Sequence, residues 1–111
     1  MKYKMTDETK TVGIHTLHRI VALVDFGDVK AGDLGGWIES KENLSQNGTA
    51  WVYDDAWVYG HAMVYGNAKV YGNATAYGDA KVYGKAWVYG NAKVYGNARV
   101  HSDVGSGVQK P

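Results

Sequence analysis

The sequence predicts an all-β fold, a left-handed parallel β-helix of about three 18-residue coils behind a non-repetitive N-terminal β cap. The first observation is a six-residue unit that runs nine times from Ala50 to Asp103 without a break in register. In every unit Ala is first, Val is third except at Ala76, and Tyr is fourth except at His101. A glycine-containing turn closes most units. A short unit repeated at a fixed period is typical of one structural piece stacked on itself.

Each unit predicts one short strand and one corner. In an extended Ala-x-Val-Tyr segment alternate side chains share a face, so Ala and Val point inward while x and Tyr point outward. A Gly-Asn pair then turns the chain, because Gly reaches positive φ freely and Asn tolerates it. Three strands and three corners make one coil. An apolar residue followed four places later by a small one, as in Val58 and Ala62, is the pattern of a left-handed β-helix.

Residues 1–49 lack the six-residue unit and are predicted to cap the first coil. Residues 2–5 fit an edge strand, residues 6–10 (TDETK) a polar turn, and residues 16–24 (TLHRIVALV) a buried strand. Dense glycines at positions 32, 35 and 36 predict tight turns or close approach of two backbones. At the other end, residues 104–111 (VGSGVQKP) are predicted as a flexible tail that leaves the last coil uncovered.

Composition excludes several classes of function. The formal net charge is +1 with acidic and basic residues interspersed, so bulk binding to nucleic acid is not expected. The absence of cysteine excludes thiolate catalysis, disulfides and cysteine-ligated zinc. No apolar run approaches the ~20 residues of a membrane span, and the N-terminus has no apolar signal region. We therefore expect a soluble protein of the cytoplasm.

One segment carries a family resemblance. The run DFGDVKAGDLGGWIESKENLSQNGTAWVYDDA, followed by VYGNA-type hexads, resembles bacterial and prophage hexapeptide-repeat proteins of the YdcK-like group over about residues 18–103. The resemblance implies a left-handed β-helix with an N-terminal cap in a bacterial cell. Some members are labelled transferases by analogy with hexapeptide acyltransferases, but the resemblance supplies no catalytic residues to carry over.

Outward residues eighteen apart lie above one another and form a ladder on each of three faces. The tyrosines are expected to stack along these ladders and stabilise the sheets. So many aromatic side chains also exceed what a soluble monomer normally exposes, and Trp and Tyr are typical interface anchors. We predict interface or ligand-stacking roles on the first face for Trp51, Tyr53, Tyr71, Trp87 and Tyr89, and on the second for Trp57 and Tyr59.

The primary hypothesis is a non-enzymatic, oligomeric binding or assembly module that holds a partner protein on its aromatic faces. A trimer and an end-to-end dimer both stay open. The alternative is a phage-type anti-defence protein that sequesters a nucleotide signal in clefts between protomers, with bases stacked on aromatic rings. Its phosphate or anion contacts would come from His18, Arg19, Lys30, Lys69, Lys81 and Arg99.

A hexapeptide-type acyltransferase is the second alternative, with His61 as its candidate base. His61 lies at a corner of the predicted coil, where a histidine is more often a solvated turn residue. The spacing of histidines and carboxylates fits no metal site, so we predict no metal, no cofactor and no catalytic residue.

Overall fold

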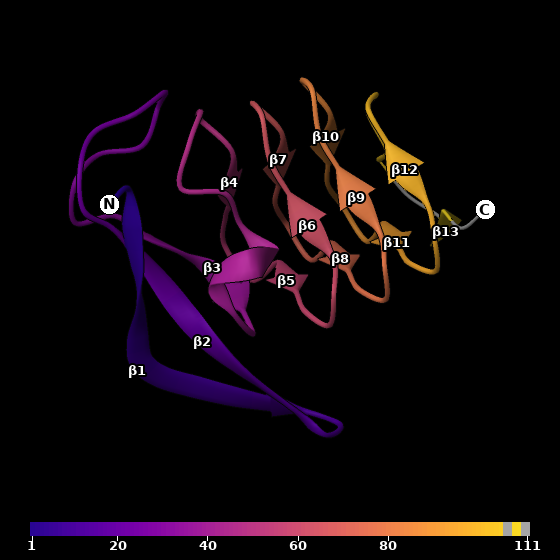
Figure 1. Cartoon of the computed structure of the whole chain (residues 1–111), viewed down its shortest axis with the longest axis horizontal. Coiled ribbons are helices and arrows are strands. Elements are labelled where there is room, and N and C mark those ends of the chain that lie inside the picture. Colours follow the sequence, from indigo (N-terminus) through magenta and orange to yellow (C-terminus); the bar gives the residue numbers. More distant parts are fainter. Residues whose placement is uncertain (106–107, 110–111) are drawn as a thin grey trace.

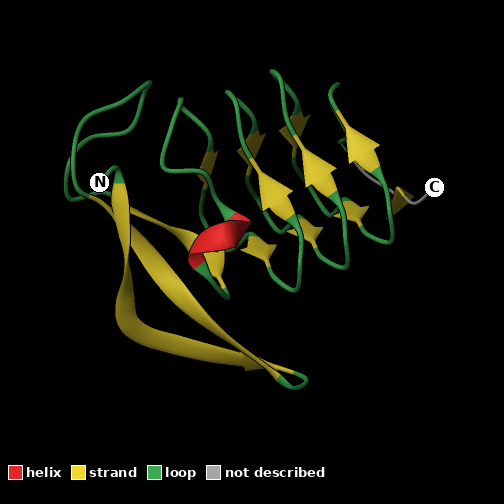
Figure 2. Ribbon diagram, in the orientation of Figure 1, coloured by secondary structure: helices red, strands yellow, loops and turns green. Residues whose placement is uncertain are grey.

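The chain folds as a parallel β-solenoid with an antiparallel N-terminal hairpin (Figure 1). The computed structural model describes residues 1–105 and 108–109. The cap contains β1 (Tyr3–Val12), β2 (His15–Ala22), β3 (Leu34–Ile38) and a short 3-10 turn, η1 (Lys41–Asn43). The solenoid strands are β4 (Trp51–Val52), β5 (Trp57–Val58), β6 (Met63–Val64), β7 (Lys69–Val70), β8 (Thr75–Ala76), β9 (Lys81–Val82), β10 (Trp87–Val88), β11 (Lys93–Val94), β12 (Arg99–Val100) and β13 (Val108–Gln109). Figure 2 shows that strands and loops make up nearly the whole fold, with one short helical turn.

Strands eighteen residues apart pair in parallel, as the repeat predicts. Trp51 and Val52 pair with Lys69 and Val70, and the same register recurs on the other two faces. In Figure 1 the chain rises along the near strands β6, β9 and β12, crosses the upper corners and descends through the far strands β7 and β10 as it advances toward the C-terminus. That winding is left-handed, so the predicted fold class is confirmed.

The inward column of the repeat forms the core. Every first-position Ala and third-position residue from Ala50 to Val100 is at most 7% exposed, so the predicted inward face is confirmed. The corner glycines have the expected positive φ, for example +70° at Gly66. There a Cβ would lie 3.1 Å from the backbone nitrogen of Gly84 in the next coil. A side chain at this corner would therefore have to push the neighbouring coil away slightly, which glycine avoids.

The solenoid begins inside the predicted cap. Trp37 pairs with Trp57 and Leu44 bridges to Val64, a spacing of twenty residues instead of eighteen. The close approach predicted from the glycines is confirmed at β3. A Cβ on Gly36 would lie 2.6 Å from the carbonyl oxygen of Ala56, so a side chain there would push β3 away from the first coil.

The hairpin β1–β2 extends one face of the solenoid into a seven-stranded sheet, in the order β1-β2-β3-β5-β8-β11-β13. The polar turn predicted for residues 6–10 is wrong, because β1 runs through it to Val12. A register shift between Met5 and Thr9 bends the strand, and such a bulge accommodates polar residues without ending the pairing. The hairpin turns instead at Gly13, where φ is +60°.

The C-terminal segment predicted as a tail contributes further pairing. The Val104 amide donates to the Trp87 carbonyl over 2.8 Å, and Val104 bridges to Val88. Val108–Gln109 pair in parallel with Lys93–Val94. The rest of the predicted tail, residues 106–107 and 110–111, lies outside the described residues. Within the described part of the chain, no helix has the length and apolar character needed to cross a membrane.

The cap buries a lysine against the first coil. Lys2 is 5% exposed, and its Nζ donates to the Ala50 carbonyl over 2.8 Å and lies 4.9 Å from the centroid of the Phe26 ring. Burial lowers the pKa of Lys2 to about 8. An unfolded lysine holds its proton to about pH 10.4, so between these values the unfolded state binds more protons. The free energy of unfolding therefore rises with pH in that window.

We expect the free energy of unfolding to increase by about 2 kcal/mol between about pH 8 and 10. Urea unfolding followed by tryptophan fluorescence at several pH values measures this, and Lys2→Met should flatten the rise. The window ends near pH 10 because burial raises the pKa of Tyr3 to about 12, which reverses the slope above that pH. Parallel pH profiles for wild type and Lys2→Met would contradict the assignment.

Candidate functional site

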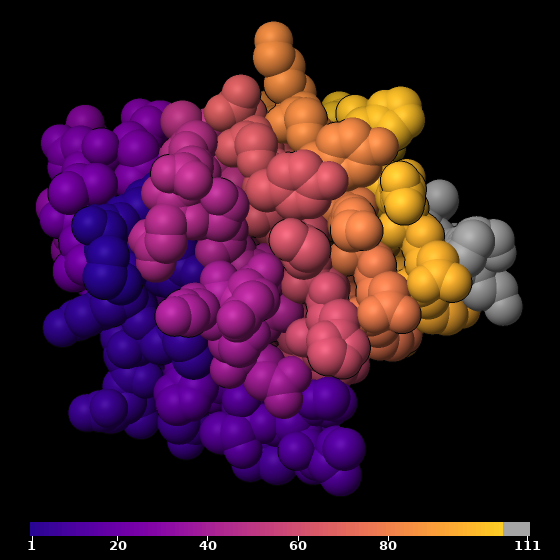
Figure 3. Space-filling view, viewed as in Figure 1, coloured from indigo at the N-terminus to yellow at the C-terminus, as the bar shows by residue number. Residues whose placement is uncertain are grey.

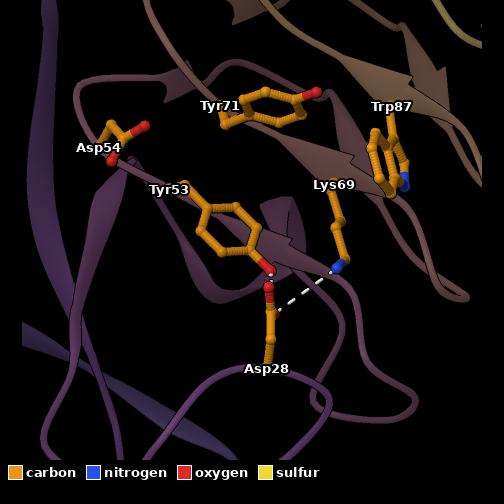
Figure 4. Close-up of a pocket in the computed structure, with 6 residues that line it drawn as sticks. All are labelled: Asp28, Tyr53, Asp54, Lys69, Tyr71 and Trp87. Carbon is orange, nitrogen blue, oxygen red and sulfur yellow. Dashed lines mark hydrogen bonds and ion pairs between the residues drawn. The ribbon is translucent and has the colours of Figure 1, made fainter.

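A pocket of about 270 Å³ opens on the first face of the solenoid, over β4, β7 and β10 (Figure 4). The coil register builds it: Tyr53 comes from the first of three successive coils, Lys69 and Tyr71 from the second, and Trp87 from the third. The loop between β2 and β3 adds Asp28. Its lining residues are Asp28, Tyr53, Asp54, Lys69, Tyr71 and Trp87.

Aromatic rings meet at steep angles around the pocket. The Tyr71 ring lies 6.2 Å from the Tyr53 ring at 80° and 6.1 Å from the Trp87 ring at 78°. On its other side Tyr71 stacks on Tyr89, 5.4 Å away at 14°. Trp87 and Tyr89 remain 44% and 37% exposed. The pocket therefore offers both ring faces and ring edges to a ligand.

The charges of the pocket centre on Asp28. Its Oδ1 accepts a 2.8 Å hydrogen bond from the Tyr53 hydroxyl and lies 3.5 Å from Lys69 Nζ. The hydrogen bond from Tyr53, followed by the charge of Lys69, lowers the pKa of Asp28. Burial and the hydrogen bond to Asp28 raise the pKa of Tyr53. With Asp54 as a second carboxylate, the lining carries two negative charges and one positive charge.

The ammonium group of Lys69 lies over two aromatic rings in this pocket. Its Nζ lies 5.5 Å from the centroid of the Trp87 ring and 5.9 Å from that of Tyr53. Asp54, at the edge, has a positive φ of 56°, which a non-glycine residue rarely adopts. Its Oδ2 accepts from the amide of Gly72 over 3.4 Å. Asp54 replaces the glycine that most units place at the corner, and it brings a carboxylate to the rim.

Trp51 corrects the predicted first-face ladder. It was expected to point outward with Trp87, but it is 1% exposed. Its ring lies edge-on to Tyr3 and Phe26, with centroids 6.1 Å and 5.2 Å away. The N-terminal cap covers this rung, and a Cβ on Gly35 would lie 2.7 Å from the Trp51 ring. Trp51 is therefore closed to a ligand, whereas Trp87, at the same position two coils later, is open to one.

The second-face residues are partly covered by the hairpin. Trp57 is half-buried beneath Lys10, whose Nζ lies 5.1 Å from the ring centroid. Tyr59 stacks on Tyr77 at 5.2 Å and 6°, and His15 lies 4.9 Å away on its other side. The predicted stacking of tyrosines is thus confirmed on this ladder, whereas on the first face Tyr53 meets Tyr71 edge-on at 80°. That the hairpin reaches this face was not predicted.

The residues predicted to contact phosphate are spread over the molecule. His18 and Arg19 lie on β2, Lys30 on the exposed β2–β3 loop, and Lys69 in the first-face pocket. Lys81 and Arg99 pair in register on the third face, the side seen in Figure 3, where successive coils form a continuous surface. The structure therefore does not bring the six into one site within a protomer.

Several residues of the candidate site escaped the sequence analysis, among them Asp28 and Lys10. Asp28 lies 25 residues before its partner Tyr53, and nothing in its turn sequence indicates that contact. Lys10 lay in the segment predicted as a turn. A signal for Asp28 existed only in its place within the DFGD run, between two stretches expected to pack together.

Histidine and carboxylate side chains meet at one further point. His15 Nδ1 lies 2.9 Å from Glu39 Oε2, and Glu39 Oε1 accepts from the Gly60 amide over 2.8 Å. Burial alone would raise the pKa of Glu39, but the hydrogen bonds from His15 and Gly60 outweigh it and lower the pKa. His61 is an exposed corner residue. Among the described residues, no group of three or more His, Cys, Asp or Glu is placed to hold a metal ion.

Comparison with known proteins shows which repeat family the hexads resemble. The family described as YdcK beta solenoid repeat matches residues 56–72 and 86–102. The hexads are therefore similar to YdcK-type solenoid repeats over these two stretches. The chain is also 36% identical to a protein named "Uncharacterized acetyltransferase YdcK" from Escherichia coli (strain K12), in a match that covers 48% of this chain. The resemblance to the YdcK-like group is confirmed, although the match covers only 19% of that relative's length.

Proposed function

We propose that this YdcK-like solenoid is a binding module whose first face holds a basic segment of a partner protein. The observation that carries the proposal is the pocket that the rings of Tyr53, Tyr71 and Trp87 line together with the carboxylates of Asp28 and Asp54. Aromatic faces attract ammonium and guanidinium groups, and a carboxylate adds charge-assisted hydrogen bonds. An arginine or lysine side chain of the partner is the ligand that this chemistry favours.

The position of Lys69 supports a cationic ligand over an anionic one. Its ammonium already lies over two rings and beside Asp28, so the pocket accepts positive charge. An exposed ion pair of this kind contributes about 1 kcal/mol or less, so an incoming guanidinium can replace it. A phosphate would meet the carboxylates of Asp28 and Asp54 instead. This pocket therefore favours a protein partner over a nucleotide.

Self-association belongs to the same proposal. Trp87 and Tyr89 carry the aromatic surface beyond the pocket onto the third coil, and both are exposed. Aromatic side chains that protrude from a polar surface are typical anchors of protein interfaces. The first face is thus the surface on which we expect either a partner protein or a second copy to dock.

A titration with small probes tests the pocket. N-acetyl-arginine amide and N-acetyl-glutamate amide are added separately while the indole N–H signal of Trp87 is followed by NMR. We expect the arginine compound alone to shift this signal, and Asp28→Asn to weaken its binding by about fivefold or more through loss of a charge-assisted contact. Asp79→Asn, at an exposed corner on another face, is the matched control and should bind normally.

The same experiment has outcomes that contradict the proposal. If both probes gave equal responses, or if Asp28→Asn left the response unchanged, the proposal of a cationic ligand would be rejected. Light scattering decides the assembly part, because a wild-type monomer at high concentration excludes self-association through this face. Acetyl-coenzyme A is a third probe, since the E. coli relative is named an acetyltransferase. Its binding, abolished by His61→Ala, would favour that second candidate function.

A further inference from the structure

A second groove separates the hairpin from the outer surface of the solenoid. It measures about 450 Å³ and is lined by Lys10, Asp55, Trp57, Asn73 and Thr75. Lys10 comes from β1, Trp57 and Thr75 from the neighbouring strands β5 and β8. The groove therefore lies on the second face, away from the pocket of the proposed function, and its two walls come from different parts of the fold.

Polar atoms without partners concentrate beside this groove. In the part of the chain that the structure describes, four buried side-chain atoms lack a hydrogen-bond partner: Arg19 Nε, Trp37 Nε1, Trp57 Nε1 and Thr75 Oγ1. The strand register joins all four residues in one column, from Arg19 on β2 to Trp37, then Trp57, then Thr75. A buried donor left unpaired costs about 1–3 kcal/mol, so a cluster of them requires an explanation.

The unpaired atoms share one chemical character. The three nitrogens are N–H donors, and the hydroxyl of Thr75 can also donate. The Lys10 ammonium lies 4.5 Å from the Trp37 ring centroid and 5.1 Å from that of Trp57, and the Arg19 guanidinium lies 4.6 Å from Trp37. The column thus holds several unpaired donors beside two cationic side chains.

The carboxylates nearby satisfy this demand poorly. Asp55 Oδ1 lies 3.5 Å from Arg19 Nη2, and Glu8 Oε1 lies 3.7 Å from Arg19 Nε. Both distances exceed those of a charge-assisted hydrogen bond. The two carboxylate side chains are 69% and 59% exposed, so water competes for them. Neither contacts Trp37 or Trp57 through a hydrogen bond.

We propose that this groove binds a small oxyanion, a carboxylate or a phosphate group. Lys10 and Arg19 provide the charge, and the indole N–H groups of Trp37 and Trp57 with the Thr75 hydroxyl provide directional donors. An oxyanion supplies several acceptor oxygens at once, which is what these donors lack. Lys10 lies over both indole rings, so its flexible side chain controls access to them. The proposal goes beyond the first-face binding site and has the opposite charge preference.

The indole N–H resonances of the four tryptophans give a direct test. They are assigned with single Trp→Phe variants of the full chain, which is then titrated with sodium acetate and, separately, with sodium phosphate at constant ionic strength set by sodium chloride. We expect the Trp37 and Trp57 signals to shift, because their N–H groups gain an acceptor, while Trp51 and Trp87 stay in place. The stronger of the two titrations identifies the class of anion.

Three variants make the test specific. Lys10→Met keeps the apolar side-chain stem over the rings and should weaken binding by about fivefold or more. Asp55→Asn removes the competing carboxylate and should strengthen binding. Lys81→Met, on the third face, should change nothing. The proposal would be overturned by equal shifts at all four tryptophans, by no shift, or by binding that Lys10→Met leaves unchanged. The groove would then be filled by water alone. Trp87 serves as the internal reference, so this result is independent of the cationic pocket.

Discussion

Val70→Asp is expected to unfold the protein. Val70 is fully buried in the middle of the stack, and its strand pairs with Val52 in the coil before and with Val88 in the coil after. A carboxylate there has no donor within the Ala and Val column. Burying an unpaired charge costs at least about 5 kcal/mol, which is comparable to the whole stability of a small domain. Loss of the far-ultraviolet circular dichroism spectrum and of the cooperative thermal transition measures the effect.

Two matched variants separate burial from charge. Val70→Ala removes apolar volume without charge and should cost about 2 kcal/mol, leaving the fold intact. Lys93→Asp places the same carboxylate at an exposed outward position and should change stability by less than about 0.5 kcal/mol. A Val70→Asp protein that unfolds cooperatively near the wild-type temperature would show that the inward column is misassigned.

The repeat made the solenoid predictable because its period is explicit in the chain. A six-residue unit with Ala and Val at alternate positions determines both the eighteen-residue register and the buried face. The same rule failed for Trp51, although Trp51 and Trp87 occupy identical places in the unit. They differ in exposure, 1% against 44%, because Tyr3, Phe26 and Gly35 cover the first coil. The six-residue unit around Trp51 does not indicate that contact with the cap.

The candidate sites were less predictable for the same reason. Each combines a ladder residue with a side chain from the non-repetitive cap: Asp28 reaches Tyr53, and Lys10 reaches Trp57. The ladder half followed from the periodicity. The cap half depends on the bend in β1 and on the path of the β2–β3 loop, which are set by packing between distant segments. The aromatic faces were thus foreseen, together with Lys69 and Arg19, but the charges of Asp28, Asp54 and Lys10 were not.

Asn43→Ala is expected to cost about 3–4 kcal/mol, far more than one hydrogen bond, because Asn43 joins the cap to the first coils. It is fully buried; its Oδ1 accepts from the amides of Glu39 and Ser40 over 3.0 and 2.8 Å, and its Nδ2 donates to the carbonyls of Gly60 and Ala62 over 3.2 and 2.8 Å.

Alanine would leave all four of these backbone groups without their side-chain partner in a site that excludes water. Urea unfolding measures the loss, and Asn97→Ala at an exposed corner is the matched control, expected within about 0.5 kcal/mol of wild type. Asn43→Asp retains both acceptor bonds but turns a carboxylate toward two carbonyls, which raises its pKa in the folded state. Stability of that variant should therefore increase as pH falls toward about 4, since the protonated form can donate again. If Asn43→Ala costs less than about 1 kcal/mol, water replaces the amide, and the cap is joined to the coils mainly by apolar contacts such as those of Trp51.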